Sequence, residues 1–219
     1  MRIHFLGHSA VLLEGSKSIL IDPFLTNNPL AAMPWKDLPR IDYVLVTHDH
    51  FDHYGDTVEI LKRDHGTLVA IHEVATAPAI ASANIAAVGM NIGGVYHAND
   101  LRIAMTLAIH SAAMGAPAGF VITMDGKTVY HAGDTAYYSD MALIPKLFGA
   151  LDLAFLPIGG HFTMDAQHAG LAVKALKPAL TVPIHYNTWP PLKADPAVFG
   201  RASRPHHVRA LTPGDSFEL

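Results

Sequence analysis

Residues 47–53 read Thr-His-Asp-His-Phe-Asp-His and follow directly on the apolar run Tyr43–Val46. An apolar run of this kind predicts a buried strand, and the chain must turn where such a strand ends. A turn there can direct imidazole and carboxylate side chains into one small volume, and borderline divalent metals bind both groups. Four potential ligands within six positions are more than one ion normally takes from so short a segment, so the segment predicts two metals side by side. The four residues are His48, His50, Asp52 and His53.

Composition restricts the class of protein. Half of the 219 residues are apolar and 16% are charged, which favours a large core over disorder. The net charge is −4 with no basic block, and no apolar run is long enough to span a bilayer. Cysteine is absent, which excludes disulfides, thiolate ligands and a cysteine nucleophile and fits a reducing compartment. We therefore expect a cytoplasmic protein with a small-molecule substrate and no nucleic-acid or membrane partner; the sequence is compatible with a monomer or a homo-oligomer.

The order of the expected elements indicates two similar halves. The first half has strands over residues 3–6, 10–14, 18–22, 43–46 and 67–71, and a helix over 57–64 that Asp56 can cap. The second half has strands over 101–108, 120–124, 128–131, 151–157 and 180–184, helical stretches over 140–148 and 166–176, and a type I′ hairpin turn at Asp125-Gly126. This order predicts two sheets stacked face to face with helices outside. No stretch resembles a linker, so we expect one domain over residues 1–219.

A two-metal site needs ligands beyond the first segment, and three later residues stand in the same setting. His110, Asp134 and His185 each lie at or just after the end of an expected strand. A lone histidine or aspartate at a strand end is more often a structural residue. The recurrence of this setting after the first segment favours metal ligands.

These motifs, taken in order, resemble those of the metallo-β-lactamase superfamily. The shared order is His-x-His-x-Asp-His, then an isolated histidine, then Gly-Asp-Thr, then a late histidine. A closer resemblance, to small single-domain metal-dependent hydrolases of bacteria and archaea similar to ascorbate-phosphate lactonases, covers nearly the whole chain. It is carried by segments such as Gly7-His8-Ser9 and residues 19–26, 89–94, 129–135 and 183–188.

The resemblance implies an α+β fold, the four-layer αββα sandwich, with two divalent metal ions where the strand ends of both sheets meet. It implies that His48, His50 and His110 hold the first ion. It implies that Asp52, His53 and His185 hold the second. Asp134 would bridge the two ions, and Asp22 would support the metal loop from behind. Zinc is the first candidate for an all histidine and carboxylate set, with manganese, iron, cobalt and nickel as alternatives.

The expected activity is hydrolysis of a small ester, lactone or phosphoester by a hydroxide that bridges two ions roughly 3.5–4 Å apart. Asp52 would orient that hydroxide and accept its proton, so Asp52 and Asp134 are the catalytic candidates. One alternative is a metal-dependent nuclease or phosphodiesterase, and another is a metal-stabilised binding protein without significant turnover. A diiron oxidoreductase of this fold would carry an acidic residue where this chain has His50, so this class of enzyme is not expected. Four residues near the same edge receive no assigned role: His8, His161, His168 and Asn187.

Overall fold

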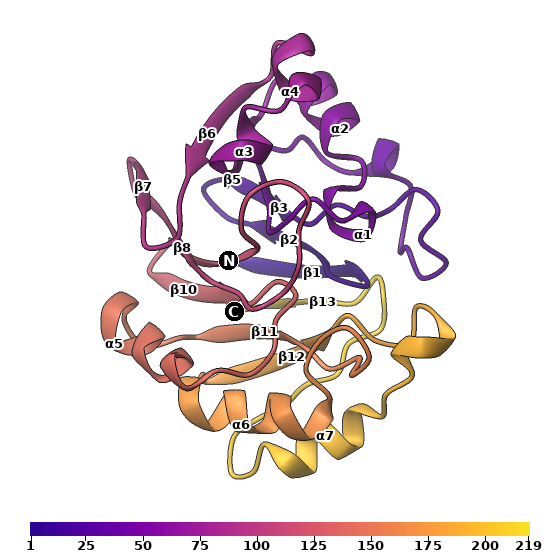
Figure 1. The fold of residues 1–219 in the computed structure, drawn as a ribbon, viewed down its shortest axis with the longest axis vertical. Helices are drawn as coiled ribbons and strands as arrows, with labels where there is room; N and C mark the ends of the chain where they lie inside the picture. The colour runs from indigo at the N-terminus through magenta and orange to yellow at the C-terminus, as the bar shows by residue number, and fades with distance from the viewer.

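The computed structural model describes all residues from Met1 to Leu219 and has four layers (Figure 1). Two β-sheets pack face to face in the middle, and helices cover the outer face of each sheet. The expected αββα sandwich is therefore confirmed. The first sheet is covered by α2 (Thr57–Asp64), α3 (His72–Ala75) and α4 (Pro78–Ser82), and the second by α5 (Ile144–Phe148), α6 (Ala166–Leu176) and α7 (Pro196–Ala202).

The first sheet has seven strands in the order β13-β1-β2-β3-β4-β5-β6. Strands β1 to β3 form an antiparallel meander, and β3 to β6 run parallel to one another. The carboxyl ends of β3 and β4 therefore lie at the same edge of the sheet. The bounds are β1 (Arg2–Gly7), β2 (Ala10–Glu14), β3 (Ser18–Ile21), β4 (Tyr43–Val46), β5 (Thr67–Ile71), β6 (Ala86–Met90) and β13 (Ser216–Glu218).

The second sheet has six strands in the order β12-β11-β10-β9-β8-β7. Because β8 and β10 are both antiparallel to β9, they run in the same direction, and β11 and β12 are parallel to β10. Four strands of this sheet thus end at one edge. The bounds are β7 (Val95–Ala98), β8 (Leu101–Leu107), β9 (Ala118–Met124), β10 (Lys127–His131), β11 (Leu153–Pro157) and β12 (Leu180–Ile184).

Strand β11 shows how the layers share the apolar residues. Leu153 and Phe155 belong to the core between the sheets, whereas Ala154 and Leu156 pack on the side of α6. Successive side chains of a strand point to opposite faces, so a strand covered on both faces must be apolar throughout. This explains why the apolar runs of the second half are continuous and do not alternate.

Two local expectations differ from the structure. Asp56 stands at the N-cap position of α2, but its Oδ2 accepts hydrogen bonds from the backbone N–H groups of Leu25 and Thr26, at 3.0 and 2.8 Å, and it does not cap the helix. The stretch expected as one helix over 140–148 is a 3₁₀ segment, η2 (Ser139–Leu143), followed by α5, in whose first turn Pro145 supplies no N–H. Three further short segments are α1 (Phe51–Tyr54), η1 (Trp35–Asp37) and η3 (Pro190–Leu192).

None of the helices combines the length and the apolar character needed to cross a bilayer. The expected hairpin turn at Asp125-Gly126 is present, with φ of 53° and 72° at its two central residues. Both angles are positive, as a type I′ turn requires.

At Gly133, directly before Asp134, the backbone conformation and the close neighbours favour glycine over any other residue. Its φ is +62°, and a Cβ there would lie 2.5 Å from the Ala118 carbonyl oxygen and 2.9 Å from the Thr47 Cβ. We expect Gly133→Ala to lower the free energy of unfolding by about 2 kcal/mol or more, because it combines backbone strain with a clash. Urea denaturation of the metal-free protein measures this loss.

Gly126→Ala is the matched control, since Gly126 has φ +72° but nothing within 4 Å of the added Cβ. It should cost only the conformational penalty of about 1 kcal/mol. Equal losses in the two variants would show that the close approach at Gly133 does not matter.

Candidate metal centre

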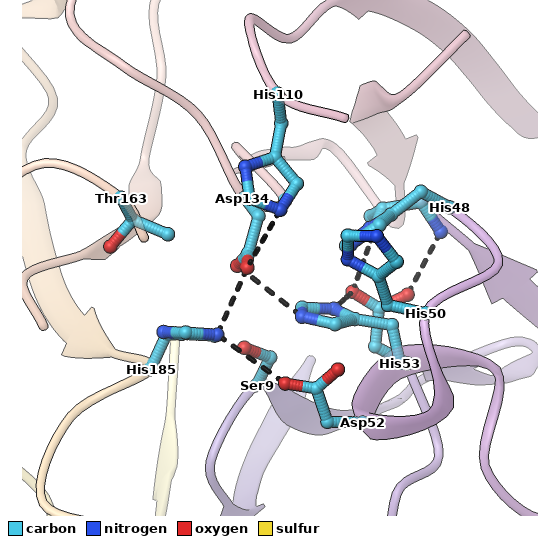
Figure 2. A network of polar contacts seen from close by, with 12 residues as sticks. Ser9, His48, His50, Asp52, His53, His110, Asp134, Thr163 and His185 are labelled. Atoms are coloured by element: carbon cyan, nitrogen blue, oxygen red, sulfur yellow. Dashed lines mark hydrogen bonds and ion pairs between the residues drawn. The ribbon is translucent and has the colours of Figure 1, made fainter. Parts of the chain in front are cut away.

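The turn after β4 delivers four of the candidate ligands. His48 follows the strand after one residue, His50 stands at the N-cap of α1, and Asp52 and His53 lie within that single helical turn. His110, Asp134 and His185 come from the segments that follow β8, β10 and β12. All seven side chains meet at the common edge of the two sheets (Figure 2). The topology thus brings together residues that are up to 137 positions apart in the chain.

Three imidazoles form a first group. One ring nitrogen of each of His48, His50 and His110 lies within 4.8 Å of the other two. The Nε2 atom of His48 is 3.0 Å from Nδ1 of His50. On its other side the His48 Nδ1 is 3.0 Å from the Thr47 hydroxyl, which donates to Asp22. This contact directs the remaining nitrogen of His48 into the site.

A second group contains Asp52, His53, His185 and, in addition, His8. The Asp52 Oδ2 atom is 3.6 Å from Nε2 of His185 and 3.2 Å from Nε2 of His8. Behind the group, the fully buried Asp22 lies 2.7 Å from Nδ1 of His53. The Nε2 atom of His53 is therefore left to face the site.

Asp134 lies between the two groups, as the dashed lines in Figure 2 show. Its Oδ2 atom is 2.9 Å from Nε2 of His185 and 3.6 Å from Nε2 of His110, and its Oδ1 atom is 3.3 Å from Nε2 of His53. One carboxylate thus contacts a member of each group. It is only 2% exposed, so the negative charge depends on these neighbours for stabilisation.

The donor atoms of the site fit divalent metal ions. The Nε2 atom of His53 and the Oδ1 atom of Asp134 are buried and face each other at 3.3 Å, yet neither makes a hydrogen bond. Buried polar atoms nearly always have a partner, and one explanation for such an exception is an ion. Imidazole nitrogens and carboxylate oxygens without thiolates are the donors of zinc, manganese, iron, cobalt and nickel sites.

Burial and the central carboxylate set the protonation of the metal-free site. Burial lowers the pKa of His48 to about 3, so its imidazole is neutral and ready to bind an ion. Burial also disfavours the charged form of His185, but the neighbouring Asp134 carboxylate raises the pKa of His185 to about 9. The pKa of Asp134 is itself lowered well below its usual value by His185 and His53, which outweigh burial. Without metal, protons on histidines therefore balance the charge of Asp134.

The four residues without an assigned role separate into two kinds. His8 is buried, and its Nδ1 lies 2.7 Å from the Thr188 hydroxyl while its Nε2 faces Asp52. It follows β1 as the other site residues follow their strands, and that position was the available signal. The other three lie outside the group of ligands: His161, His168 and Asn187 are exposed.

A cleft of about 520 Å³ opens above the ligand groups. His50, Asp52, His110, Asp134 and His185 line its floor. The other lining residues, which we call its walls, are Phe51, Phe162, Trp189, Pro191 and Ser111. The volume lies within the range that is typical of small-molecule sites.

Comparison with known proteins gives a consistent family. Residues 17–186 match the model of the beta-lactamase superfamily domain. A metal-dependent hydrolase of Pyrococcus abyssi is 45% identical and one of Thermococcus kodakarensis is 44% identical, each over 225 aligned positions that cover both chains completely. The solved structure of a metallo hydrolase from Ignicoccus hospitalis is similar with a TM-score of 0.91 at 40% identity, covering 100% of this chain and 98% of that one.

Metal binding should release protons. At pH 7 the His185 imidazole carries a proton in the metal-free protein, since its pKa is raised to about 9, and a metal ligand must be neutral. We expect about one to two protons to be released per chain at pH 7 and fewer at pH 9, with the apparent metal affinity rising between these values. Anaerobic calorimetric titration with Mn²⁺ in two buffers of different ionisation enthalpy measures the number.

His185→Asn is the matched variant for this measurement and should release fewer protons at pH 7. Binding heats that are independent of the buffer would contradict the predicted protonation of the site.

His8 should contribute measurably to stability. His8→Ala removes the partner of the Thr188 hydroxyl and one partner of Asp52 in a buried setting. We expect a loss of about 1–3 kcal/mol in the free energy of unfolding of the metal-free protein. His168→Ala, whose side chain is 63% exposed, should change it by less than about 0.5 kcal/mol. A similarly small change for His8→Ala would rule out this contribution.

Proposed function

The chain belongs to the beta-lactamase superfamily of metal-dependent hydrolases, and from this premise we propose that it is a dinuclear enzyme that cleaves a small ester, lactone or phosphoester. One observation carries the proposal: two adjacent groups of ligand side chains share the Asp134 carboxylate at the floor of an open cleft. Two distinct groups of donor atoms suit two ions better than one.

In this proposal His48, His50 and His110 hold one ion, and Asp52, His53 and His185 hold the other. Asp134 contacts both groups and would bridge the ions. Zinc is our first candidate, with manganese, iron, cobalt and nickel as alternatives that accept the same donors. A bound pair of such ions lowers the pKa of a shared water and polarises the carbonyl or phosphoryl oxygen of the substrate.

The carboxylate of Asp52 is suited to orient the attacking water. Burial alone would raise its pKa, but the neighbouring imidazoles of His185 and His8 lower the pKa of Asp52 well below its usual range. The group is therefore an ionised acceptor at neutral pH. It lines the cleft, so it can accept a hydrogen bond from a molecule held there.

Asp22 and Thr47 hold the ligands in register. Asp22 accepts a hydrogen bond from the Thr47 backbone N–H at 2.8 Å and another from its hydroxyl at 2.8 Å. The same carboxylate fixes the ring of His53. Rigid support of this kind limits the movement of the ligands during turnover.

The two alternative functions have less support. A nuclease needs cationic side chains along the nucleic acid, and no lysine or arginine lines this cleft. A binding protein without turnover would not require a complete ligand set beside an open cleft, and the full-length relatives are hydrolases.

Metal content and turnover test the proposal together. Protein purified without added metal should contain about two ions per chain, and His48→Ala and Asp134→Ala should each lower that content. Both variants should lose at least about 100-fold in kcat/KM for p-nitrophenyl acetate or bis(p-nitrophenyl) phosphate, since each removes an ion or its bridge. Elemental analysis and absorbance assays measure the two quantities.

His168→Ala, an exposed substitution outside the cleft, is the control for both measurements. One ion per active chain would leave a mononuclear hydrolase, and the absence of turnover on both substrates with two ions bound would contradict the proposed chemistry.

A further inference from the structure

We propose that the cleft selects substrates whose non-reacting part is an uncharged aliphatic or aromatic group, held by an aromatic wall of Phe51, Phe162 and Trp189. The proposal rests on the proposed hydrolase function and narrows it. Among small esters, lactones and phosphoesters, it favours those with an apolar substituent over those that carry a second phosphate or carboxylate away from the reacting bond.

The exposure of the wall is the first observation. Phe51 is 70% exposed and Phe162 is 58% exposed, and these are two of the three most exposed large apolar side chains of the protein. A single exposed apolar residue is ordinary. Here, however, both rings and Trp189 line the one cleft that also contains the candidate metal ligands. Exposed apolar side chains gathered at one concave site indicate a ligand that covers them.

The wall is also held in place on one side. The Phe51 ring packs at 5.8 Å, centroid to centroid, against both Phe24 and Trp189. Trp189 in turn lies 5.8 Å from the buried Phe24 ring and 5.2 Å from the His8 ring. Because these contacts exist without a ligand, the aromatic side chains of the wall would lose little conformational entropy when a substrate binds. Phe162 lies in the segment after β11 and contributes the remaining ring of the wall.

Charge is the third observation. No lysine or arginine lines the cleft, and its ionised groups are the carboxylates of Asp52 and Asp134 beside the imidazoles. Anionic groups of substrates are usually recognised by arginine, lysine or helix N-termini. Away from the ligand floor, a phosphate or carboxylate would therefore meet aromatic carbon and lose its hydration without compensation. The same walls favour an alkyl or phenyl group.

Hydrolysis of simple esters tests the selectivity without an aromatic leaving group, and pH-stat titration of the released acid measures the rate. The set is ethyl acetate, ethyl hexanoate, hexyl acetate and monoethyl succinate, so the chain is on the acyl side, on the alcohol side, or ends in a charge. For the metal-loaded enzyme we expect kcat/KM to be about tenfold higher for ethyl hexanoate or for hexyl acetate than for ethyl acetate. This corresponds to about a twofold gain for each additional methylene that the wall partly covers. Monoethyl succinate should fall below ethyl acetate.

The ratio to compare is kcat/KM for the preferred six-carbon ester divided by kcat/KM for ethyl acetate. We expect this ratio to fall about threefold or more in Phe51→Ala and in Phe162→Ala, and to fall less in Phe51→Leu. Leu147→Ala is the matched control, since Leu147 is 67% exposed on α5 and lies outside this cleft. Equal kcat/KM for the short and long esters, or ratios unchanged in both phenylalanine variants, would overturn the inference and leave the hydrolase function standing.

A binding measurement keeps the inference testable if no ester is cleaved. The chain has two tryptophans, so Trp35→Phe leaves Trp189 as the only one. In the metal-loaded variant, hexanoate should change the Trp189 fluorescence at concentrations about tenfold lower than acetate does. Such discrimination without any turnover would support the apolar site and overturn the hydrolase function. Equal responses to both carboxylates would overturn the apolar site.

Discussion

The edge where the two sheets meet is organised around one buried carboxylate. Asp134 is almost fully enclosed, and its two oxygens face the imidazoles of His53, His110 and His185. Burying an ionised carboxylate is costly unless positive charge is brought to it. In the metal-free protein histidine protons supply that charge, and under the proposed function divalent ions would replace them. The two groups of candidate ligands lie on either side of Asp134, and each contributes an imidazole that faces its carboxylate.

The backbone at this edge is strained at one candidate ligand and at two residues that support the ligands. His8, Asp22 and His185 all adopt positive φ, at 57°, 47° and 54°, although none is glycine. Such conformations cost of order 1 kcal/mol or more each and persist only when the surrounding structure holds them. Here the His185 N–H donates to the His8 carbonyl at 2.9 Å and ties the end of β12 to the end of β1. This hydrogen bond between the ends of the two sheets helps to hold both strained residues in place.

Most of the fold followed from the sequence, because strands such as β4 and β11 are uninterrupted apolar runs and Asp125-Gly126 specifies its turn. Strands β6, β7 and β13 did not follow. Ala86–Met90 is rich in alanine and glycine. Val95–Ala98 and Ser216–Glu218 lie at sheet edges and contain no buried residue, so none of the three strands has a strong apolar pattern. Their pairing is decided by neighbours that are distant in sequence. Asp56 shows the same limit, since its partners on residues 25 and 26 outcompete the local cap.

The candidate ligands could be proposed from the sequence because histidine and aspartate recur at the ends of expected strands. His8 stands in the same setting after β1, but its role could not be assigned, since its partners Asp52 and Thr188 are set by tertiary packing. Phe51, in α1, is not a candidate ligand, but it stands directly between two residues that are. The candidate ligands His50 and Asp52 stand on either side of it, and all three side chains line the same cleft. The residue between two ligands can therefore change the surface offered to a substrate while the ligands stay in place. Under the two proposals, such a site separates the chemistry, which the histidines and aspartates would perform, from the choice of substrate, which would depend on the rings around them.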